Sequence, residues 1–251
     1  MAAKIGLQIY SIRDIYAKDL KGSLKLVKDS GYDAVDFFGG VKINAQELKG
    51  LLDEIGLEVA GWHVPWEYLS RPDLLEMFVT YNKVIGNKYL ISPGLPGEYT
   101  KDAATWLEGA NKLNEIAASL KKYGFRTGLH NHSAEFAALE GTTDQPWDIV
   151  AKNTSDDVVL QLDLGNALSG GKDPLEILKR YSGRNQTIHF KPFSKSKGFG
   201  VPVGEDDIDW KEVIKFCKTS GNTEYFIVEY EENDPEAGIK ASVVNLRKLL
   251  A

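Results

Sequence analysis

Short apolar runs and amphipathic stretches alternate along the whole chain. The apolar or β-branched runs, which are typical of strands, occupy residues 4–10, 32–38, 57–63, 88–93, 126–130, 158–163, 186–190 and 225–230. Apolar residues recur at i, i+3, i+4 and i+7 between them and indicate helices over residues 19–31, 44–56, 106–124, 173–183 and 209–221. Asn44 stands where an N-cap is expected, and Gly31 and Gly56 stand where helices commonly end.

This alternation predicts βαβ units and a parallel sheet with right-handed crossovers. Eight such units in 251 residues fit a closed (β/α)₈ TIM barrel that forms a single domain over residues 1–251. The first strand is not followed by G-x-G-x-x-G, so the local signature of a dinucleotide fold is missing.

Charge and hydropathy narrow the classes of partner. The net charge of −6 argues against nucleic acid, because binding to a phosphate backbone relies on Lys and Arg. The sequence contains no apolar run of 18 residues and no secretory leader pattern, so we expect a cytoplasmic protein without a membrane partner.

All four histidines fall near the carboxyl ends of predicted strands. His63 ends the third strand, His130 and His132 end the fifth, and His189 lies near the end of the seventh. In a (β/α)₈ barrel these ends share one face, and the chemistry of such enzymes takes place there. The histidine pattern therefore predicts a site at that face.

Carboxylates join the histidines in barrel order. Asp163 ends the sixth strand and Glu229 ends the eighth, so strands five to eight offer His130, Asp163, His189 and Glu229. An acid in a run as apolar as residues 158–163 is costly unless it is paired or bound to a cation. Mixed imidazole and carboxylate donors suit one divalent ion, with Mn²⁺ expected and Mg²⁺, Co²⁺, Zn²⁺ or Fe²⁺ as alternatives.

Each of these residues also has a purely structural interpretation. Asp163 could cap the following helix, and His189 could be a core histidine bonded to a carbonyl group. Glu229 could form a structural ion pair with Lys191. Asp36, at the end of the second strand, could belong to the site or to a turn.

Further residues are candidates for contact with a substrate. His63 and Trp62 lie in the aromatic stretch "GWHVPWEYL", and such rings are expected in a pocket that binds sugars or polyols. His132 and Glu135 follow the fifth strand. Arg13, after the first strand, could hold a substrate oxyanion or form a surface ion pair.

The chain resembles the xylose isomerase-like TIM-barrel superfamily, in the branch of sugar phosphate isomerases/epimerases. The resemblance is carried by "GLQIYSIRD", "GYDAVDF", "LHNHSAEF", "LQLDLGNALSGGKDP", "RNQTIHFKPF", "VGEDDIDW" and "FIVEYE", in this order over nearly the whole chain. Many members hold one divalent metal with Glu, Asp, His and Glu from strands five to eight. By this resemblance Asp163, His189 and Glu229 would be ligands.

The fifth strand departs from the family pattern. Where epimerases commonly read Glu-Asn-His, this chain reads His130-Asn131-His132. Either His130 replaces the glutamate as a ligand, or Glu135 reaches back to the metal. The departure puts in doubt an epimerase site in which two metal-bound glutamates serve the two faces of one carbon.

The resemblance implies an enzyme that abstracts a proton beside a carbonyl through a metal-stabilised enediolate. Glu229 or His130 would be the base, and Lys191 and His132 would bind or polarise substrate oxygens. A sugar isomerase or epimerase is the first expectation. A lyase that removes water or an aglycone from a keto-sugar, 3-keto-glycoside or inosose is the alternative, and a non-catalytic carbohydrate-binding barrel is a third possibility. Exposed barrel helices are compatible with a homodimer.

Overall fold

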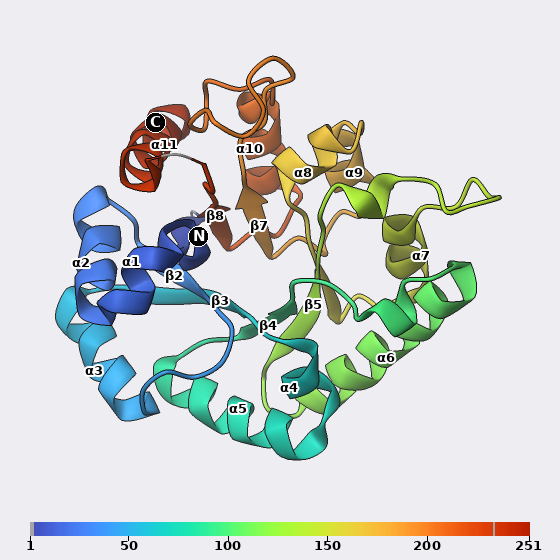
Figure 1. The fold of residues 1–251 in the computed structure, drawn as a ribbon, viewed down its shortest axis with the longest axis horizontal. Coiled ribbons are helices and arrows are strands. Elements are labelled where there is room, and N and C mark those ends of the chain that lie inside the picture. The colour runs from blue at the N-terminus through green and yellow to red at the C-terminus, as the bar shows by residue number, and fades with distance from the viewer. Residues whose placement is uncertain (1–2, 233) are drawn as a thin grey trace.

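A central ring of strands is surrounded by helices in the computed structural model, which describes residues 3–232 and 234–251 (Figure 1). The strands are β1 (Lys4–Gln8), β2 (Ala34–Phe38), β3 (Glu58–His63), β4 (Tyr89–Ser92), β5 (Arg126–His130), β6 (Val158–Gln161), β7 (Thr187–Phe190) and β8 (Tyr225–Val228). They form one sheet of eight strands in the order β6-β5-β4-β3-β2-β1-β8-β7, and every pair is parallel. The predicted (β/α)₈ barrel is confirmed.

The seam between β6 and β7 closes the ring with few backbone bonds. The amide of Leu160 donates to the carbonyl of Arg184 (2.8 Å), and the amide of His189 donates to that of Leu162 (2.9 Å). A single bridge pairs Asp163 with His189. Two of the predicted metal ligands therefore face each other across the seam.

Helices follow the strands around the outside of the barrel (Figure 1). They are α1 (Arg13–Lys18), α2 (Leu20–Ser30), α3 (Ala45–Ile55), α4 (Trp66–Ser70), α5 (Pro72–Ile85), α6 (Ala103–Lys121), α7 (Pro146–Asn153), α8 (Leu164–Ser169), α9 (Pro174–Arg180), α10 (Trp210–Thr219) and α11 (Pro235–Leu250), with short 3₁₀ turns at Ile9–Ile12, Gly97–Tyr99 and Ala134–Phe136. The five helices delimited from the sequence correspond to α2, α3, α6, α9 and α10. No helix within the described ranges is long and apolar enough to cross a membrane.

Local signals set the helix ends. Asn44 caps α3 by accepting a hydrogen bond from the amide of Glu47 (2.8 Å), as expected. Helix α6 begins three residues before its predicted start, because Asp102 and Thr105 form a capping box there. Helices α5, α7 and α11, which the sequence analysis did not delimit, each begin with proline, a residue suited to the first helical turn.

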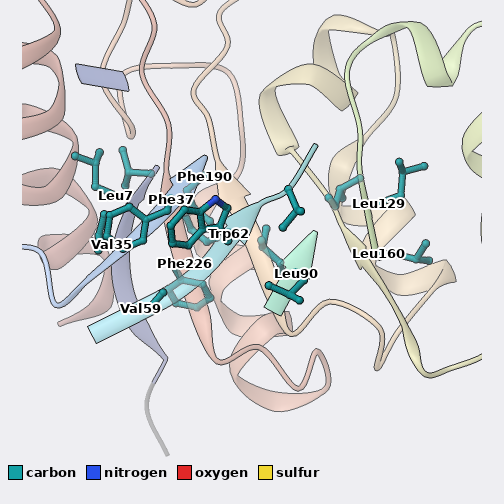
Figure 2. Close-up of a cluster of buried hydrophobic side chains, with 14 of the residues drawn as sticks. Leu7, Val35, Phe37, Val59, Trp62, Leu90, Leu129, Leu160, Phe190 and Phe226 are labelled. Atoms are coloured by element: carbon teal, nitrogen blue, oxygen red, sulfur yellow. The ribbon is translucent and has the colours of Figure 1, made fainter. Parts of the chain in front are cut away.

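Alternation along the strands separates two environments. Side chains on the outer face, among them Leu7, Phe37, Trp62 and Phe190, pack in the main apolar core between sheet and helices (Figure 2). The opposite face carries small apolar clusters such as Ala34, Ala60 and Ile227, and polar residues toward the carboxyl ends of the strands. The buried histidines and carboxylates thus lie toward the carboxyl ends of the strands.

Gly128 in β5 gives a test of the packing between strands. A Cβ atom at this position would lie 1.9 Å from the carbonyl oxygen of Val159 in β6. We expect Gly128→Ala to lower the free energy of unfolding by about 3 kcal/mol, because backbone cannot move aside as a flexible side chain can. Urea denaturation followed by circular dichroism measures this change.

Gly50 in α3 provides the control, since a Cβ atom there meets no atom within 4 Å. Gly50→Ala should raise the free energy of unfolding by about 0.5–1 kcal/mol, because alanine is the better helix former. Equal stability of Gly128→Ala and the wild type would contradict the close approach of β5 and β6.

Candidate active site

Four polar side chains from β5 to β8 meet at the mouth of the barrel. His130 ends β5, Asp163 follows β6, His189 lies in β7 and Glu229 follows β8. Each offers one potential ligand atom, and these atoms lie within 4.8 Å of one another. All four side chains are buried. The structure therefore brings together the four residues that the sequence analysis selected as metal ligands, and we call them the donor cluster.

The donor cluster fits a cation. Asp163 Oδ2 and His130 Nδ1 are buried and have no hydrogen-bond partner among the described residues. The Nε2 atom of His130 lies 3.9 Å from Asp163 Oδ2, too far for a hydrogen bond. A buried carboxylate oxygen without a partner is costly, and a divalent ion is a suitable partner for mixed carboxylate and imidazole donors.

Asp163 combines a structural and a potential ligand role. Its Oδ1 atom accepts a hydrogen bond from the amide of Asn166 (2.7 Å) and caps α8. Its own amide donates to Asn131 Oδ1 (2.7 Å). These contacts fix the side chain, and its Oδ2 atom remains without a partner in the donor cluster. The capping interpretation is correct, and it does not compete with the role of a ligand.

Glu229 lies between two positively charged or proton-donating groups. Its Oε2 atom is 2.5 Å from His189 Nδ1, and Lys191 Nζ donates to its Oε1 atom (3.1 Å). Burial alone would raise the pKa of Glu229, but Lys191 and the hydrogen bond with His189 outweigh burial and hold that pKa well below its usual range. Glu229 is therefore ionised at neutral pH. The predicted ion pair with Lys191 is present.

Burial and neighbouring groups shift the pKa values of the other three members of the donor cluster in different directions. Burial raises the pKa of Asp163 to about 7, against the opposing effect of Lys191. Burial and the neighbouring His189 and His63 lower the pKa of His130 well below its usual range, so its imidazole is neutral. For His189, burial opposes the charge, but hydrogen bonds with Asp36 and Glu229 raise the pKa to about 9.

A cavity of about 450 Å³ opens above the donor cluster. Its lining consists of Gln8, Tyr10, Phe38, Gly39, His63, Pro65, Pro93, His130, His132, Glu229 and Glu231. His63 and His132, predicted to contact substrate, are therefore in place beside the cluster, and the His63 ring stacks on His189 with centroids 4.9 Å apart. The cavity is large enough for a monosaccharide or a cyclic polyol.

The predicted contact of Trp62 with a substrate is wrong, because its side chain is not among the residues that line the cavity. Its side chain is 1% exposed, packs on Phe37 with ring centroids 4.8 Å apart, and donates from Nε1 to the carbonyl of Gly39 (2.7 Å) (Figure 2). Successive strand residues point to opposite faces, so His63 enters the cavity and Trp62 enters the core. Trp62 supports the site from behind.

Arg13 and Glu135 also lie outside the cavity lining. The Arg13 guanidinium stacks on the Tyr10 ring at 4.6 Å from its centroid and lines an adjoining hollow. Glu135 accepts a hydrogen bond from the amide of His132 through Oε2 (2.8 Å). That carboxylate holds the loop after β5, and of the two candidates it is His130 that belongs to the donor cluster.

Several cavity residues were not selected from the sequence. Gln8, Tyr10 and Glu231 are examples. Gln8 could have been found, because it ends a strand at a position that alternation directs inward. Tyr10 and Glu231 lie beyond the regular strands, where alternation no longer predicts direction.

Comparison with known proteins identifies the family of the chain, and this family has the barrel fold described above. The family described as xylose isomerase-like TIM barrel matches residues 24–249. An inosose dehydratase from Clostridium perfringens is 26% identical over 177 residues, which cover 63% of this chain and 58% of that protein. The match thus spans less than two thirds of that relative.

Solved structures share the fold. A sugar phosphate isomerase/epimerase from Parabacteroides distasonis superposes with a TM-score of 0.84 at 20% identity, covering 98% of this chain and 96% of the other. The IOLI protein with a bound zinc atom superposes with a TM-score of 0.74 at 17% identity, covering 98% of each chain. With a family match over most of its length, this chain belongs to the xylose isomerase-like TIM-barrel family.

Proposed function

We propose that this chain is a metal-dependent lyase that removes a proton beside the carbonyl of a keto-sugar or cyclic keto-polyol and then eliminates water. The observation that carries this proposal is the asymmetry of the cavity. Carboxylates Glu229 and Glu231 follow β8, whereas the imidazoles of His63 and His130 come from β3 and β5. Each of these two strands lies three positions away from β8 around the ring.

This asymmetry favours elimination over epimerisation. Epimerisation needs two groups on opposite faces of one carbon that exchange the roles of acid and base. Elimination needs one base and a different group that assists the departing hydroxyl. The similarity to inosose dehydratases, such as that of Clostridium perfringens, supports the same outcome.

The donor cluster would hold the cofactor, one divalent ion. Mixed imidazole and carboxylate donors suit Mn²⁺ or Zn²⁺, and the IOLI protein of similar fold binds zinc. A bound ion would act as a Lewis acid that stabilises negative charge on substrate oxygens. His130, Asp163, His189 and Glu229 would provide its ligands.

Individual side chains would remove the proton and assist the departing hydroxyl. Glu229, ionised and open to the cavity, would accept the proton from the carbon beside the carbonyl. Lys191 Nζ, which donates to that carboxylate (3.1 Å) from outside the cavity lining, would keep Glu229 ionised. His132 lines the cavity and is exposed, so it can exchange protons with solvent and donate one to the departing hydroxyl. Pro65 and Pro93 add apolar surface to the cavity lining.

Isomerisation or epimerisation, the first expectation from the sequence, remains the second candidate. All these reactions begin with removal of a proton beside a carbonyl, and they differ in whether the substrate is then reprotonated or loses a hydroxyl. The similarity in fold to the sugar phosphate isomerase/epimerase of Parabacteroides distasonis supports this candidate.

The charges around the cavity favour an uncharged substrate. Lys191 already forms ion pairs with Glu229 and Glu231. No Lys or Arg of the described ranges is among the residues that line the cavity. Arg13 stacks on Tyr10 and lines the adjoining hollow. A phosphate group would therefore meet carboxylates with no Lys or Arg side chain in the described lining to balance its charge. The Tyr10 and Phe38 rings, in contrast, can pack against the apolar face of a neutral sugar or polyol ring.

Metal binding tests the role of the donor cluster. Isothermal titration with Mn²⁺ and Zn²⁺ should give one equivalent bound, and Asp163→Asn should weaken binding by at least about 100-fold, because even outer partners of ligands contribute 10- to 100-fold. Asparagine is a good N-cap, so α8 should persist. Asp173→Asn, which alters the exposed cap of α9, is the matched control and should bind as the wild type does. Unchanged binding by Asp163→Asn would exclude Asp163 as a ligand.

Turnover of keto-sugars and inosose tests the proposed elimination and the role of Glu229 as its base. In D₂O, metal-loaded protein should release water from inosose or a keto-sugar, as followed by NMR across a panel that includes 3-keto-glycosides. Glu229→Gln, with bound metal quantified in the same sample, should slow the reaction by about 10²- to 10⁴-fold, because the amide cannot accept the proton. Glu232→Gln, the change at an exposed neighbour outside this cavity, should leave the rate unaltered.

The outcome separates the candidates. Deuterium that enters a rearranged sugar without loss of water would replace the lyase with the isomerase or epimerase. Bound metal without exchange on any substrate would support a carbohydrate-binding barrel.

A phosphorylated substrate tests the preference of the cavity for an uncharged ligand. The phosphorylated counterpart of the best substrate should show a kcat/KM at least about 10-fold lower, equivalent to about 1.4 kcal/mol. Glu231→Gln should reduce this difference, because it removes one carboxylate from the cavity lining. Equal or better turnover of the phosphorylated compound by the wild type would contradict the charge argument.

A further inference from the structure

Asp36 is a buried carboxylate that the proposed chemistry does not use. It lies in β2, has no exposed surface and does not line the cavity. Its Oδ2 atom is 3.2 Å from His189 Nε2 and accepts a hydrogen bond from Gln8 Nε2 (2.9 Å). Such a group is costly to bury, so its contacts must compensate for the loss of water.

The barrel provides space for this carboxylate. The register between β2 and β3 shifts after Val35, and the shift pairs Asp36 with Gly61. A Cβ atom on Gly61 would lie 2.8 Å from Asp36 Oδ1. Any larger residue at position 61 would therefore displace the carboxylate. The Oδ1 atom has no hydrogen-bond partner within the described part of the chain.

Asp36 contacts one member of the donor cluster, His189, through the ring nitrogen that faces away from Glu229. His189 Nδ1 lies 2.5 Å from Glu229 Oε2, and the opposite nitrogen, Nε2, faces Asp36. His63 is the other imidazole nearby, with Nε2 3.8 Å from Asp36 Oδ2, but His63 Nε2 is 2.6 Å from Gln161 Oε1. The geometry therefore links Asp36 chiefly to His189.

We propose that Asp36 is a positioning residue that holds the N–H of His189 at Nε2, so that Nδ1, which faces Glu229, can ligate the metal. This inference rests on the metal site proposed above. Histidine ligands commonly donate their second N–H group to a carboxylate, which fixes the ring orientation and makes the ligating nitrogen more basic. Gln8 holds the carboxylate from the neighbouring strand β1, and Gly61 gives it room.

The test compares metal affinity with the stability of the metal-free protein. Asp36→Asn should weaken Zn²⁺ binding by about 10-fold and Asp36→Leu by about 100-fold, measured by competition with a chelating dye. The unfolding temperature of metal-free Asp36→Asn should fall, because the substitution removes a buried partner of His189. A purely structural role predicts the same fall in stability with unchanged affinity for Zn²⁺.

A spectroscopic readout tests the orientation directly. In the Zn²⁺-loaded wild type, long-range ¹H–¹⁵N correlation spectra should show His189 protonated at Nε2, and this signature should be lost in Asp36→Leu. Gln161→Leu is the matched control, because Gln161 is buried nearby and bonds His63 and Thr187 but no member of the donor cluster. Its Zn²⁺ affinity should stay within about threefold of the wild type.

The negative results distinguish failure of the proposed metal site from failure of the proposed role of Asp36. No Zn²⁺ binding by the wild type would overturn the metal site and, with it, this inference. Tight binding by the wild type and by both Asp36 variants would overturn the role of Asp36 alone. An equal loss of affinity in Gln161→Leu would also overturn it, because the effect would then come from general loosening of the barrel interior.

Discussion

Charge compensation inside the barrel governs the rest of the site. Three carboxylates, Asp36, Asp163 and Glu229, are buried at the carboxyl ends of the strands, where each would be unstable alone. Lys191 and His189 balance part of this charge through direct contacts. The Asp163 side chain accepts one backbone hydrogen bond, from the amide of Asn166, and its other oxygen has no partner among the described residues. This incomplete balance distinguishes a site prepared for a cation from a self-contained salt-bridge network.

The order of elements and the donor cluster could be predicted because both depend on short-range patterns. Apolar runs mark the strands, and parallel strands place their carboxyl ends together, so His130 and Glu229 meet although they are far apart in the chain. The direction of Trp62 follows from that of His63, its neighbour on β3, because successive strand residues face opposite sides, so the two cannot both enter the cavity. Tyr10 and Glu231 lie beyond strand ends, where direction depends on tertiary packing.

A structural and a functional role are combined in single residues of this site. Asp163 caps α8 with one oxygen and offers the other to the donor cluster. Glu229 forms an ion pair with Lys191 and also faces the cavity. A residue that a helix cap or an ion pair immobilises is better placed for ligation, because less conformational freedom is lost when the ion binds.

The β6–β7 seam has a consequence for the lifetime of the protein. Asp163 and His189 lie on its two sides and form its single bridge, so an ion bound to both would fasten the ring at its weakest join. Ligands that bind only the native state shift the folding equilibrium in its favour. A bound ion would thus raise the resistance of the barrel to local opening at this seam and to proteolysis there.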